Sequence, residues 1–350
     1  MEYRQLGRSG LRVSTVTLGT MGFGGTGWAS PVGRIDVDGA RRQIDICREA
    51  GVNLFDTADV YSDGLSEQIL GEALGKNRDD VLIATKVRGD MGPGPNDGGL
   101  SRYHIVRACE ASLRRLGTDH IDLYQVHEWD GLTALDETLS ALDALVRSGK
   151  VRYIGSSNYT GWQLMKSLWI SDRDRLESFV SQQIYYSLQA RDAENELVPI
   201  AIDQNLGILV WSPLAGGLLS GKYRRGQEAP EGTRRFEGWT EPPVHDEDRL
   251  YDTVDALVAI AEEHGVSAAQ VALAYTLAKP AVTSVIVGAR TEEQLRDNLA
   301  AAELSLSEAE LSRLDDVSGV PLLYPYWHQA NTGAGRLGPA DLSLLGRHLP

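Results

Sequence analysis

Four side chains suited to proton transfer follow the ends of predicted strands. Asp56 ends one apolar segment, Tyr61 lies one short loop further on, and Lys86 and His127 end the next two segments. If these segments are neighbouring parallel strands, their carboxyl ends meet at one face of the fold, where catalytic side chains gather. The spacing therefore predicts one site that contains a carboxylate, a phenol, an ammonium and an imidazole.

The chemistry that this set favours is proton donation to a carbonyl oxygen. A tyrosine with a pKa of about 10 is a weak acid at neutral pH, and a neighbouring ammonium lowers that pKa. We expect Lys86 to supply this charge and Asp56 to hold the lysine as its counter-ion. His127 would hydrogen-bond the substrate oxygen or share a proton with Tyr61. Such a donor suits hydride addition to a ketone or an aldehyde.

Each of these residues also has a simpler interpretation. A strand-end Asp is often a helix cap, a single Lys is usually a solvated charge, and a single Tyr often anchors a loop. His127, Glu128 and Asp130 could suggest a metal site, but neighbours in an extended segment point to opposite sides. We therefore predict no metal. The argument for catalysis depends on the four residues occurring together.

The elements that would position this site alternate along the chain. Apolar runs predict eight strands, at 16–20, 52–56, 81–86, 121–127, 151–157, 178–183, 207–212 and 283–288. Helical periodicity follows each of them, at 37–50, 67–74, 102–116, 132–148, 160–169, 194–205, 268–277 and 291–301. Continuous apolar strands are typical of parallel strands buried on both faces. Eight such units favour an α/β fold of the (β/α)8 TIM barrel type over an open doubly wound sheet.

Several segments lie outside the repeat. Residues 3–13 read as a β-hairpin that closes the barrel floor, and long loops are predicted at 88–100 and 212–236. An extra helix is expected after residue 307, followed by an aromatic tail at about 319–350 that we place over the barrel mouth. No linker separates the units, so residues 1–350 are predicted to form a single domain.

A glycine pattern near the first strand could be mistaken for a nucleotide-binding fingerprint. The sequence GFGGTG at residues 22–27 follows a strand, as the glycines of a Rossmann fold do. That motif needs a helix directly behind it to receive the pyrophosphate, and here Pro31 and Gly33 prevent one. We therefore interpret these glycines as a flexible loop at the barrel mouth.

Composition narrows the classes of partner and compartment. A net charge of −15 argues against nucleic acid, because phosphate binding needs clustered Lys and Arg. We expect no membrane span, since no run of about 18 apolar residues occurs, and no signal peptide, so a cytoplasmic location is the default. The two cysteines, Cys47 and Cys109, are predicted to be buried free thiols.

Taken together, the motifs resemble those of the aldo-keto reductases, in family order and over nearly the whole chain. The blocks that carry the resemblance are NLFDTADVYSDGLSEQILGEAL, VLIATKV, DLYQVHEWD, GSSNY, QIYYSL, WSPLAGGLLSGKY and VIVGARTEEQLRDNL. The resemblance implies a barrel that binds NADP(H) without a Rossmann fold. It also implies a catalytic tetrad of Asp56, Tyr61, Lys86 and His127, with Tyr61 as general acid in reduction and base in oxidation.

The resemblance further implies where the cofactor would bind. The residues implied for the nicotinamide end are Gly19, Thr20, Met21, Asp56, Ser157, Asn158, Gln183 and Trp211. Among them, Ser157, Asn158 and Gln183 would hydrogen-bond the carboxamide. Trp211 would stack on the ring, at a position where the family commonly has Tyr.

The remaining cofactor residues follow strands seven and eight. Those implied for the pyrophosphate loop are Ser212, Pro213, Leu214, Gly216 and Lys222, and those for the adenosine end are Gly288, Arg290, Gln294 and Asn298. Arg290 would meet the 2′-phosphate and favour NADP over NAD, because a guanidinium binds phosphate with a planar pair of donors. A surface arginine near a helix start is the alternative interpretation.

The substrate is expected to be a small carbonyl compound or an alcohol. Residues expected to border the pocket with Tyr61 and His127 are Trp28, Trp129, Tyr324, Tyr326 and Trp327. These aromatics would suit a bulky aryl, alicyclic or sugar-like substrate, although ordinary packing of the tail explains them nearly as well.

Two other functions are compatible with the same motifs. One is an NADP(H)-binding regulatory subunit with slow turnover, of the potassium-channel β-subunit type, which resembles this chain through the tetrad itself. The other is a barrel lyase or isomerase that works without nicotinamide.

Overall fold

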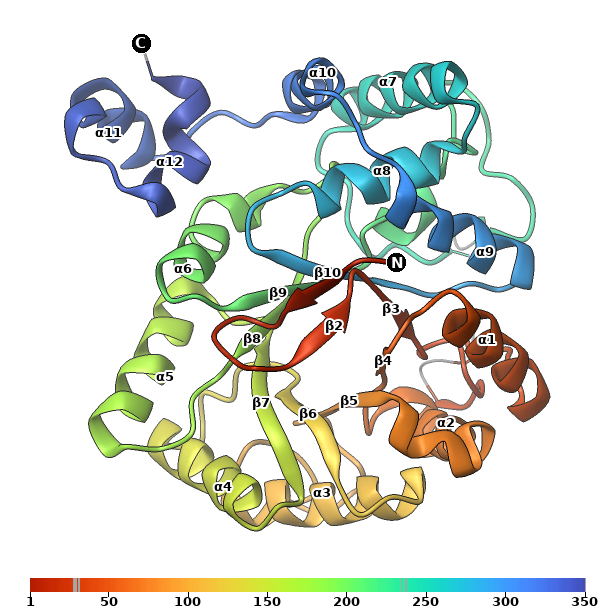
Figure 1. Ribbon diagram of the computed structural model, residues 1–350, viewed down its shortest axis with the longest axis vertical. Helices are drawn as coiled ribbons and strands as arrows, with labels where there is room; N and C mark the ends of the chain where they lie inside the picture. Colours follow the sequence, from red (N-terminus) through yellow and green to blue (C-terminus); the bar gives the residue numbers. More distant parts are fainter. Residues whose placement is uncertain (28–29, 31, 234, 237, 350) are drawn as a thin grey trace.

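Eight parallel strands form a closed barrel in the computed structural model, which describes residues 1–27, 30, 32–233, 235–236 and 238–349 (Figure 1). The strands follow each other around the barrel in chain order, and the last pairs with the first. They are β3 (Val16–Gly19), β4 (Leu54–Asp56), β5 (Leu82–Val87), β6 (Ile121–Val126), β7 (Val151–Ser157), β8 (Ser181–Tyr185), β9 (Gly207–Trp211) and β10 (Val282–Val287). The predicted (β/α)8 barrel is confirmed.

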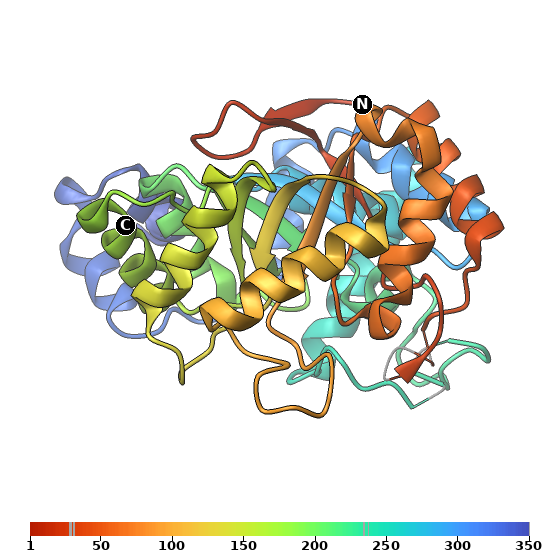
Figure 2. The same ribbon diagram turned by 90° about the horizontal axis from the view of Figure 1, so that it is seen from below.

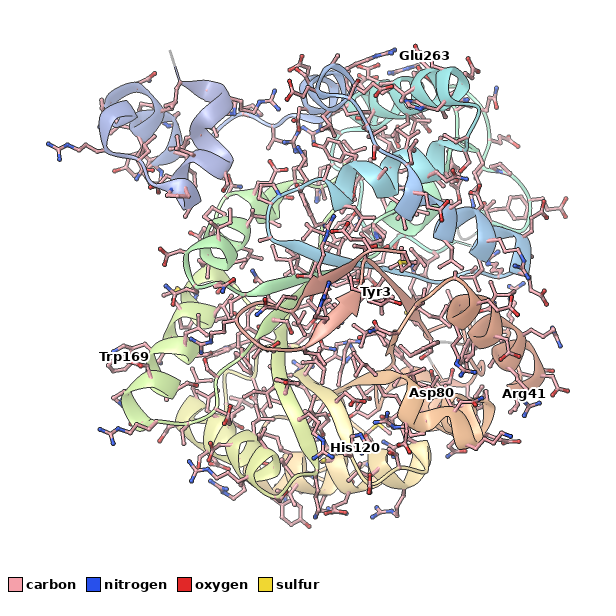
Figure 3. The ribbon with its side chains drawn as sticks, viewed as in Figure 1. Tyr3, Arg41, Asp80, His120, Trp169 and Glu263 are labelled. Atoms are coloured by element: carbon pink, nitrogen blue, oxygen red, sulfur yellow. The ribbon has the colours of Figure 1, made fainter. Side chains whose placement is uncertain are left out.

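Helices surround the barrel, and every predicted one is present in the structure. Nine of the helices are α1 (Val37–Glu49), α2 (Leu65–Leu74), α3 (Arg102–Leu116), α4 (Leu135–Arg147), α5 (Gly161–Asp174), α6 (Leu197–Asp203), α8 (Ala268–Leu277), α9 (Glu292–Ala300) and α10 (Glu308–Ser318). The apolar faces of the first eight pack on the outward side chains of the strands to form the main core, whereas Leu314 of α10 belongs to a second cluster. Figure 3 shows the opposite faces, where Arg41 of α1 and Trp169 of α5 point outward.

An 18-residue helix, α7 (Glu247–His264), was missed in the sequence. It lies between the long loop after β9 and the barrel helix α8, and its buried residues include Leu250, Val254 and Leu257. Their spacing of four and three, behind the N-cap Asp246, is a regular helix signal that could have been found.

The N-terminal hairpin closes one end of the barrel. β1 (Tyr3–Gln5) pairs antiparallel with β2 (Arg12–Ser14), and Figure 2 shows the hairpin at the end opposite the long loops. Leu6 and Val13 of the hairpin join a buried cluster with barrel residues such as Leu54. Because this end is filled by apolar side chains, a small-molecule site is left to the other end, where the strand carboxyl ends lie.

The C-terminal tail does not lie over the barrel mouth, so that expectation is wrong. Its helices α11 (Tyr326–Thr332) and α12 (Pro339–Leu345) lie on the flank of the barrel, and α12 packs against α6 (Figure 1). Ion pairs help to hold the tail there, since Arg347 contacts both Asp315 and Asp316 of α10. The sequence alone does not show which acidic residues this arginine side chain will pair with, so it does not predict where the tail lies.

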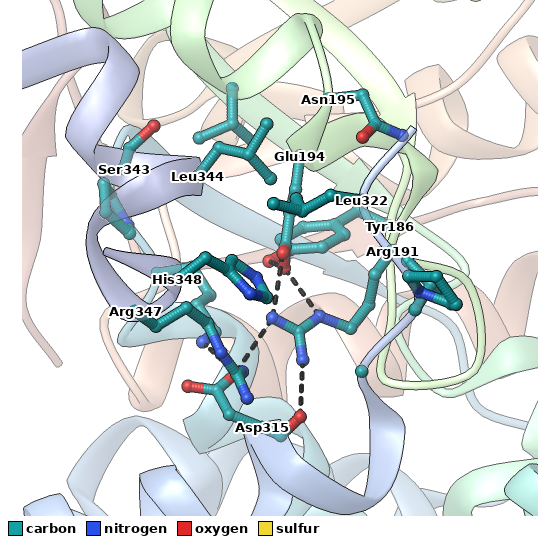
Figure 4. A pocket seen from close by; sticks show the side chains of 16 residues that line it. Tyr186, Arg191, Glu194, Asn195, Asp315, Leu322, Ser343, Leu344, Arg347 and His348 are labelled. Carbon is teal, nitrogen blue, oxygen red and sulfur yellow. Dashed lines mark hydrogen bonds and ion pairs between the residues drawn. The ribbon is translucent and has the colours of Figure 1, made fainter. Parts of the chain in front are cut away.

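A cavity of about 210 Å³ lies between this tail and the barrel (Figure 4). At its base the buried Arg191 reaches Glu194 with two hydrogen bonds of 2.8 Å and Asp315 with an ion pair of 3.0 Å. Its lining includes Leu344 of α12 but none of Asp56, Tyr61, Lys86 and His127. The cavity is therefore separate from the predicted active site.

Other features bear on the predicted class of protein. Cys47 and Cys109 are buried free thiols, as predicted, and burial raises the pKa of each to about 12. Within the described ranges, no helix combines the length and apolarity needed to cross a bilayer. Over the same residues, no group of three or more His, Cys, Asp or Glu side chains could hold a metal ion.

Candidate active site

A buried ion pair forms the centre of the site. Lys86 at the end of β5 is fully buried, and its Nζ donates to Asp56 Oδ1 at 2.5 Å. The same Nζ donates to the backbone oxygen of Thr57 at 2.8 Å and to the Tyr61 hydroxyl at 3.2 Å. An ammonium has three donors, so these three acceptors satisfy it completely. The structure thus brings Asp56, Tyr61 and Lys86 together as the sequence predicts.

Tyr61 is fixed by a tight turn after β4. The turn Tyr61–Gly64 contains Ser62 and Asp63 in the left-handed region, with φ of 51° and 55°. The Ser62 hydroxyl donates to the backbone oxygen of Phe23 at 3.0 Å and accepts from the backbone N–H of Gly25 at 3.0 Å. The turn that carries the phenol is therefore bonded to the glycine-rich loop at residues 22–27.

This contact explains why the loop at residues 22–27 is rich in glycine. A Cβ on Gly24 would lie 2.9 Å from Ser62, and one on Gly25 would lie 2.4 Å from the backbone oxygen of Gly33. Both residues also have positive φ, of 90° and 142°. The glycines are therefore needed for close packing beside Tyr61, in agreement with the rejection of a Rossmann fingerprint.

Burial sets the protonation of the site. It raises the pKa of Tyr61, and the ammonium of Lys86 opposes that rise without cancelling it. The expectation of a lowered Tyr61 pKa is therefore wrong for this structure, because desolvation of the phenolate outweighs the nearby charge. Burial disfavours the Lys86 ammonium, but the Asp56 carboxylate more than compensates, so the pKa of Lys86 is raised.

His127 is neutral at ordinary pH. Burial, together with the charges of Lys86 and Arg88, lowers its pKa to about 3. Its ring lies edge-on to that of Tyr61, with the ring centroids 5.8 Å apart and an interplanar angle of 76°. A neutral imidazole beside the phenol can hydrogen-bond a substrate oxygen, whereas Tyr61 keeps the proton that could be donated.

Two further acidic residues, Asp59 and Glu67, lie buried beside the tetrad. Asp59 is fully buried, and its Oδ1 accepts from the Val60 N–H at 2.7 Å, while Oδ2 has no hydrogen-bond partner among the described residues. Burial and the nearby charge of Glu67 raise the pKa of Asp59 well above its ordinary value. Glu67 is itself paired with Arg115 at 2.6 Å. Burial therefore disfavours the ionised form of Asp59.

The residues implied for the nicotinamide end converge on the tetrad. Ser157 lies opposite Gln183 in the register of β7 and β8, and Gln183 Nε2 donates to Asp56 Oδ2 at 2.8 Å. Asn158 accepts from Trp211 Nε1 at 3.0 Å. The buried Ser157 hydroxyl has no partner among the described residues, as expected of a group that bonds a ligand. These residues fit a carboxamide.

Two residues near this end were not anticipated. The ring of Tyr185 stacks on that of Trp211, with the centroids 4.9 Å apart and an interplanar angle of 29°. Gln125 of β6 is fully buried and donates to Asp56 Oδ2 at 3.1 Å. An inward-facing amide within the apolar strand Ile121–Val126 was the signal that could have identified Gln125.

Glycines bring the first and last barrel strands close together. A Cβ on Gly288 would lie 3.5 Å from the backbone oxygen of Gly19, and Gly19 pairs in register with Asp56. The Thr20 N–H donates to the backbone oxygen of Asp56 at 2.9 Å, and Met21 follows in the chain. Gly19 and Thr20 thus lie directly beside Asp56 of the tetrad.

The loop after β9 begins with a tight turn that is held by its own hydrogen bonds. Ser212, Ala215 and Gly216 have φ of 50°, 49° and 66°, and the Ser212 hydroxyl accepts from the Gly216 N–H at 3.1 Å. The backbone N–H groups of Ala215 and Gly217 donate within the loop, to the backbone oxygens of Ser212 and Leu214 at 2.8 Å each. Pro213 and Leu214 lie within this turn, and a Cβ on Gly217 would lie 3.2 Å from Lys222 Nζ. The binding of a pyrophosphate by this loop remains an expectation from the resemblance.

The residues implied for the adenosine end gather where this loop meets α9. The Arg290 backbone N–H donates to Gln294 Oε1 at 3.1 Å, and the Arg290 guanidinium donates to the backbone oxygen of Gly232. Asn298 is buried on the same helix. Arg290 therefore connects the helix start with the loop at residues 212–236.

The implied substrate residues are only partly brought together. Trp129, which follows His127 by two residues, packs edge-on against Tyr159 and Trp162 at centroid distances of 5.3 and 5.4 Å. Tyr324, Tyr326 and Trp327 belong to the tail on the flank, where Tyr324 and Trp327 are 75% and 48% exposed. The structure does not bring these three to the tetrad. Trp28 lies outside the described residues.

The sequence is similar to those of known proteins. The model of the aldo/keto reductase family matches residues 15–318. A Bacillus subtilis (strain 168) protein named "Uncharacterized oxidoreductase YrpG" is 43% identical over 330 residues, covering 91% of this chain and 96% of that protein. The "Probable voltage-gated potassium channel subunit beta" of Arabidopsis thaliana is 37% identical, covering 87% and 92%. The "Versiconal hemiacetal acetate reductase" of Aspergillus parasiticus is 35% identical, covering 90% and 96%.

Proposed function

Because the chain belongs to the aldo/keto reductase family, a family of oxidoreductases, we propose that it transfers hydride between NADP(H) and an aldehyde, a ketone or the corresponding alcohol. The observation that carries this proposal is the Lys86 ammonium, which donates to the Tyr61 hydroxyl at 3.2 Å. Because an ammonium cannot accept, the phenol oxygen must be the acceptor, so the hydrogen of the Tyr61 O–H does not face Lys86. This geometry supports Tyr61 as the proton donor to a carbonyl oxygen.

In reduction, the residues of the tetrad act on the carbonyl oxygen. The reduced nicotinamide, when bound, supplies the hydride that the carbonyl carbon receives. Tyr61 donates its proton to the oxygen as negative charge develops there, and Lys86 stabilises the phenolate that is left. Neutral His127 hydrogen-bonds the same oxygen and orients the carbonyl. A proton from solvent then restores the phenol, and in oxidation the steps run in reverse.

The cofactor residues divide into three sets. Ser157, Asn158 and Gln183 would hold the carboxamide, and Trp211 would stack on the ring. The turn at Ser212 would hold the pyrophosphate, and Arg290 would favour the 2′-phosphate of NADP(H). Support for the first set comes from the buried Ser157 hydroxyl, which has no partner among the described residues, and support for the second from the match of residues 15–318 to the aldo/keto reductase family.

The second candidate is a regulatory subunit that binds NADP(H) and turns over slowly. What favours it is the 37% identity to the Arabidopsis thaliana protein named as a probable potassium channel β-subunit. Both functions need the same cofactor site, so nucleotide binding alone does not separate them. Turnover does, because an enzyme must complete many cycles on a carbonyl substrate.

The test measures both properties on the same protein. We expect NADPH to quench the fluorescence of Trp211, and NADPH oxidation with 4-nitrobenzaldehyde or a quinone to exceed roughly one turnover per second. A panel of ketones, aldehydes and secondary alcohols then defines the substrate class. Quenching without turnover on any member of the panel would favour the regulatory subunit, and absence of NADPH binding would contradict both functions.

A further inference from the structure

The carboxylate of Asp56 organises two amide side chains in addition to Lys86. Oδ1 accepts from Lys86, whereas Oδ2 accepts from Gln125 Nε2 at 3.1 Å and from Gln183 Nε2 at 2.8 Å. Gln183 Nε2 also donates to Gln125 Oε1 at 3.2 Å. All four side chains are buried. The acid–base pair and a residue of the proposed nicotinamide site thus share one hydrogen-bond network.

The chemistry of this network fixes which way each amide points. An ionised carboxylate only accepts hydrogen bonds, so the amide atoms that face Asp56 must be the nitrogens. Gln125 therefore turns its Nε2 to Asp56 and its Oε1 to Gln183. The two hydrogens of Gln183 Nε2 are matched by two acceptors, Asp56 Oδ2 and Gln125 Oε1. Only the oxygen of the Gln183 amide is left for a ligand.

The neighbouring strand leaves room for this side chain at Gly155, where a Cβ would also lie 2.6 Å from Ser181 Oγ. Gln125 pairs in register with Gly155 of β7, and a Cβ on Gly155 would lie 3.3 Å from Gln125 Cγ. That distance is tighter than an ordinary carbon contact, so a larger residue at position 155 would crowd the amide. The Gln125 amide donates one hydrogen bond and accepts another, and burying such a group costs free energy unless both partners are in place.

We propose that Gln125 is a positioning residue that locks the Gln183 amide with its oxygen toward the nicotinamide carboxamide. The inference rests on the proposed function and extends it to cofactor selectivity. An oxygen presented in this way accepts from the carboxamide NH2 group, so the site selects cofactors that carry that group. Without Gln125, Gln183 loses one acceptor and its amide becomes able to rotate.

The experiment compares NADP+ with its 3-acetylpyridine analogue, in which a methyl group replaces the carboxamide NH2. Binding of each to the full-length protein is measured by quenching of intrinsic fluorescence. We expect the wild-type protein to bind NADP+ about tenfold more tightly than the analogue, the size of one hydrogen bond. In Gln125→Met the ratio should fall below threefold, because affinity for NADP+ is lost while affinity for the analogue is kept.

Two further variants separate positioning from general damage. Gln182→Met removes a neighbouring buried amide that donates instead to the backbone oxygen of Leu197, so it should keep the wild-type ratio. In a Gln183→Met background, adding Gln125→Met should change NADP+ affinity less than twofold, because Gln125 acts through Gln183. If Gln125→Met does not fold, Gln125→Asn, which is one methylene shorter, takes its place.

The outcomes distinguish this inference from the proposed function. If Gln125→Met weakens the binding of both nucleotides by the same factor, or leaves both affinities unchanged, the affinity ratio stays at its wild-type value. Gln125 then does not position Gln183, and the inference is overturned. The same conclusion follows if the effects of the two single variants simply add. If the wild-type protein binds neither nucleotide, the proposed function itself fails, and the inference fails with it.

Discussion

The ammonium of Lys86 should account for a large part of the rate of carbonyl reduction. Its Nζ lies 3.2 Å from the Tyr61 hydroxyl, and at an effective dielectric constant of about 20 a full charge pair at that distance is worth about 5 kcal/mol. If about half of the negative charge has developed on the phenol oxygen in the transition state, the ammonium contributes about 2.5 kcal/mol. Lys86→Met should therefore lower kcat/KM for reduction by roughly 70-fold.

The assay must separate this loss from loss of the fold. Removing Lys86 leaves the Asp56 carboxylate buried and unpaired, which costs roughly 3–5 kcal/mol of stability. The double variant Lys86→Met/Asp56→Asn avoids that charge, so it should be more stable than the single variant and equally slow. Lys150→Met, which removes a lysine paired with Glu110 at the surface, serves as the control. A folded Lys86→Met protein that loses less than fivefold in kcat/KM would refute the electrostatic argument.

Two further predictions concern Asp59 and Arg290. Because the pKa of Asp59 is raised in the folded protein, ionisation of the unfolded chain favours unfolding as pH rises above about 4. Asp59→Asn should therefore add ~1–3 kcal/mol of stability in urea unfolding at pH 7.5 and less at pH 4.5, whereas the exposed Asp63→Asn should add nothing. An equal gain at both pH values would contradict a raised pKa of Asp59. Arg290→Ala should weaken NADPH binding by ~1–3 kcal/mol with little effect on NADH, and Arg296→Ala in the following helix α9 should change neither. Equal weakening of both nucleotides would exclude Arg290 from the 2′-phosphate.

The positions of the tetrad could be predicted because the topology itself brings them together. Parallel strands that follow each other around a barrel end at the same face, so Asp56 and Lys86 become neighbours wherever the strands are correctly identified. The side-chain chemistry then restricts their contacts, because a buried ammonium must find acceptors. The same reasoning could have included Gln125, whose polar side chain within an apolar strand also needs buried partners.

Other features depend on quantities that the sequence does not provide. The net direction of the Tyr61 pKa shift is set by a competition between burial and the Lys86 charge, and sequence patterns do not reveal the degree of burial. The tail position depends on surface ion pairs such as Arg347 with Asp316, which many other surface sites could offer. Sequence patterns alone place the aromatic residues of that tail at the pocket mouth, whereas the structure places Tyr324 on the flank.

The most direct test of the central claim replaces the phenol itself. Tyr61→Phe removes the hydroxyl that donates the proton and keeps the ring. The measurement is the rate of hydride transfer in a single turnover at saturating NADPH and substrate, together with the Kd for NADPH. Our account predicts a loss of at least ~100-fold in rate with a nearly unchanged Kd. A loss smaller than tenfold would show that another group supplies the proton.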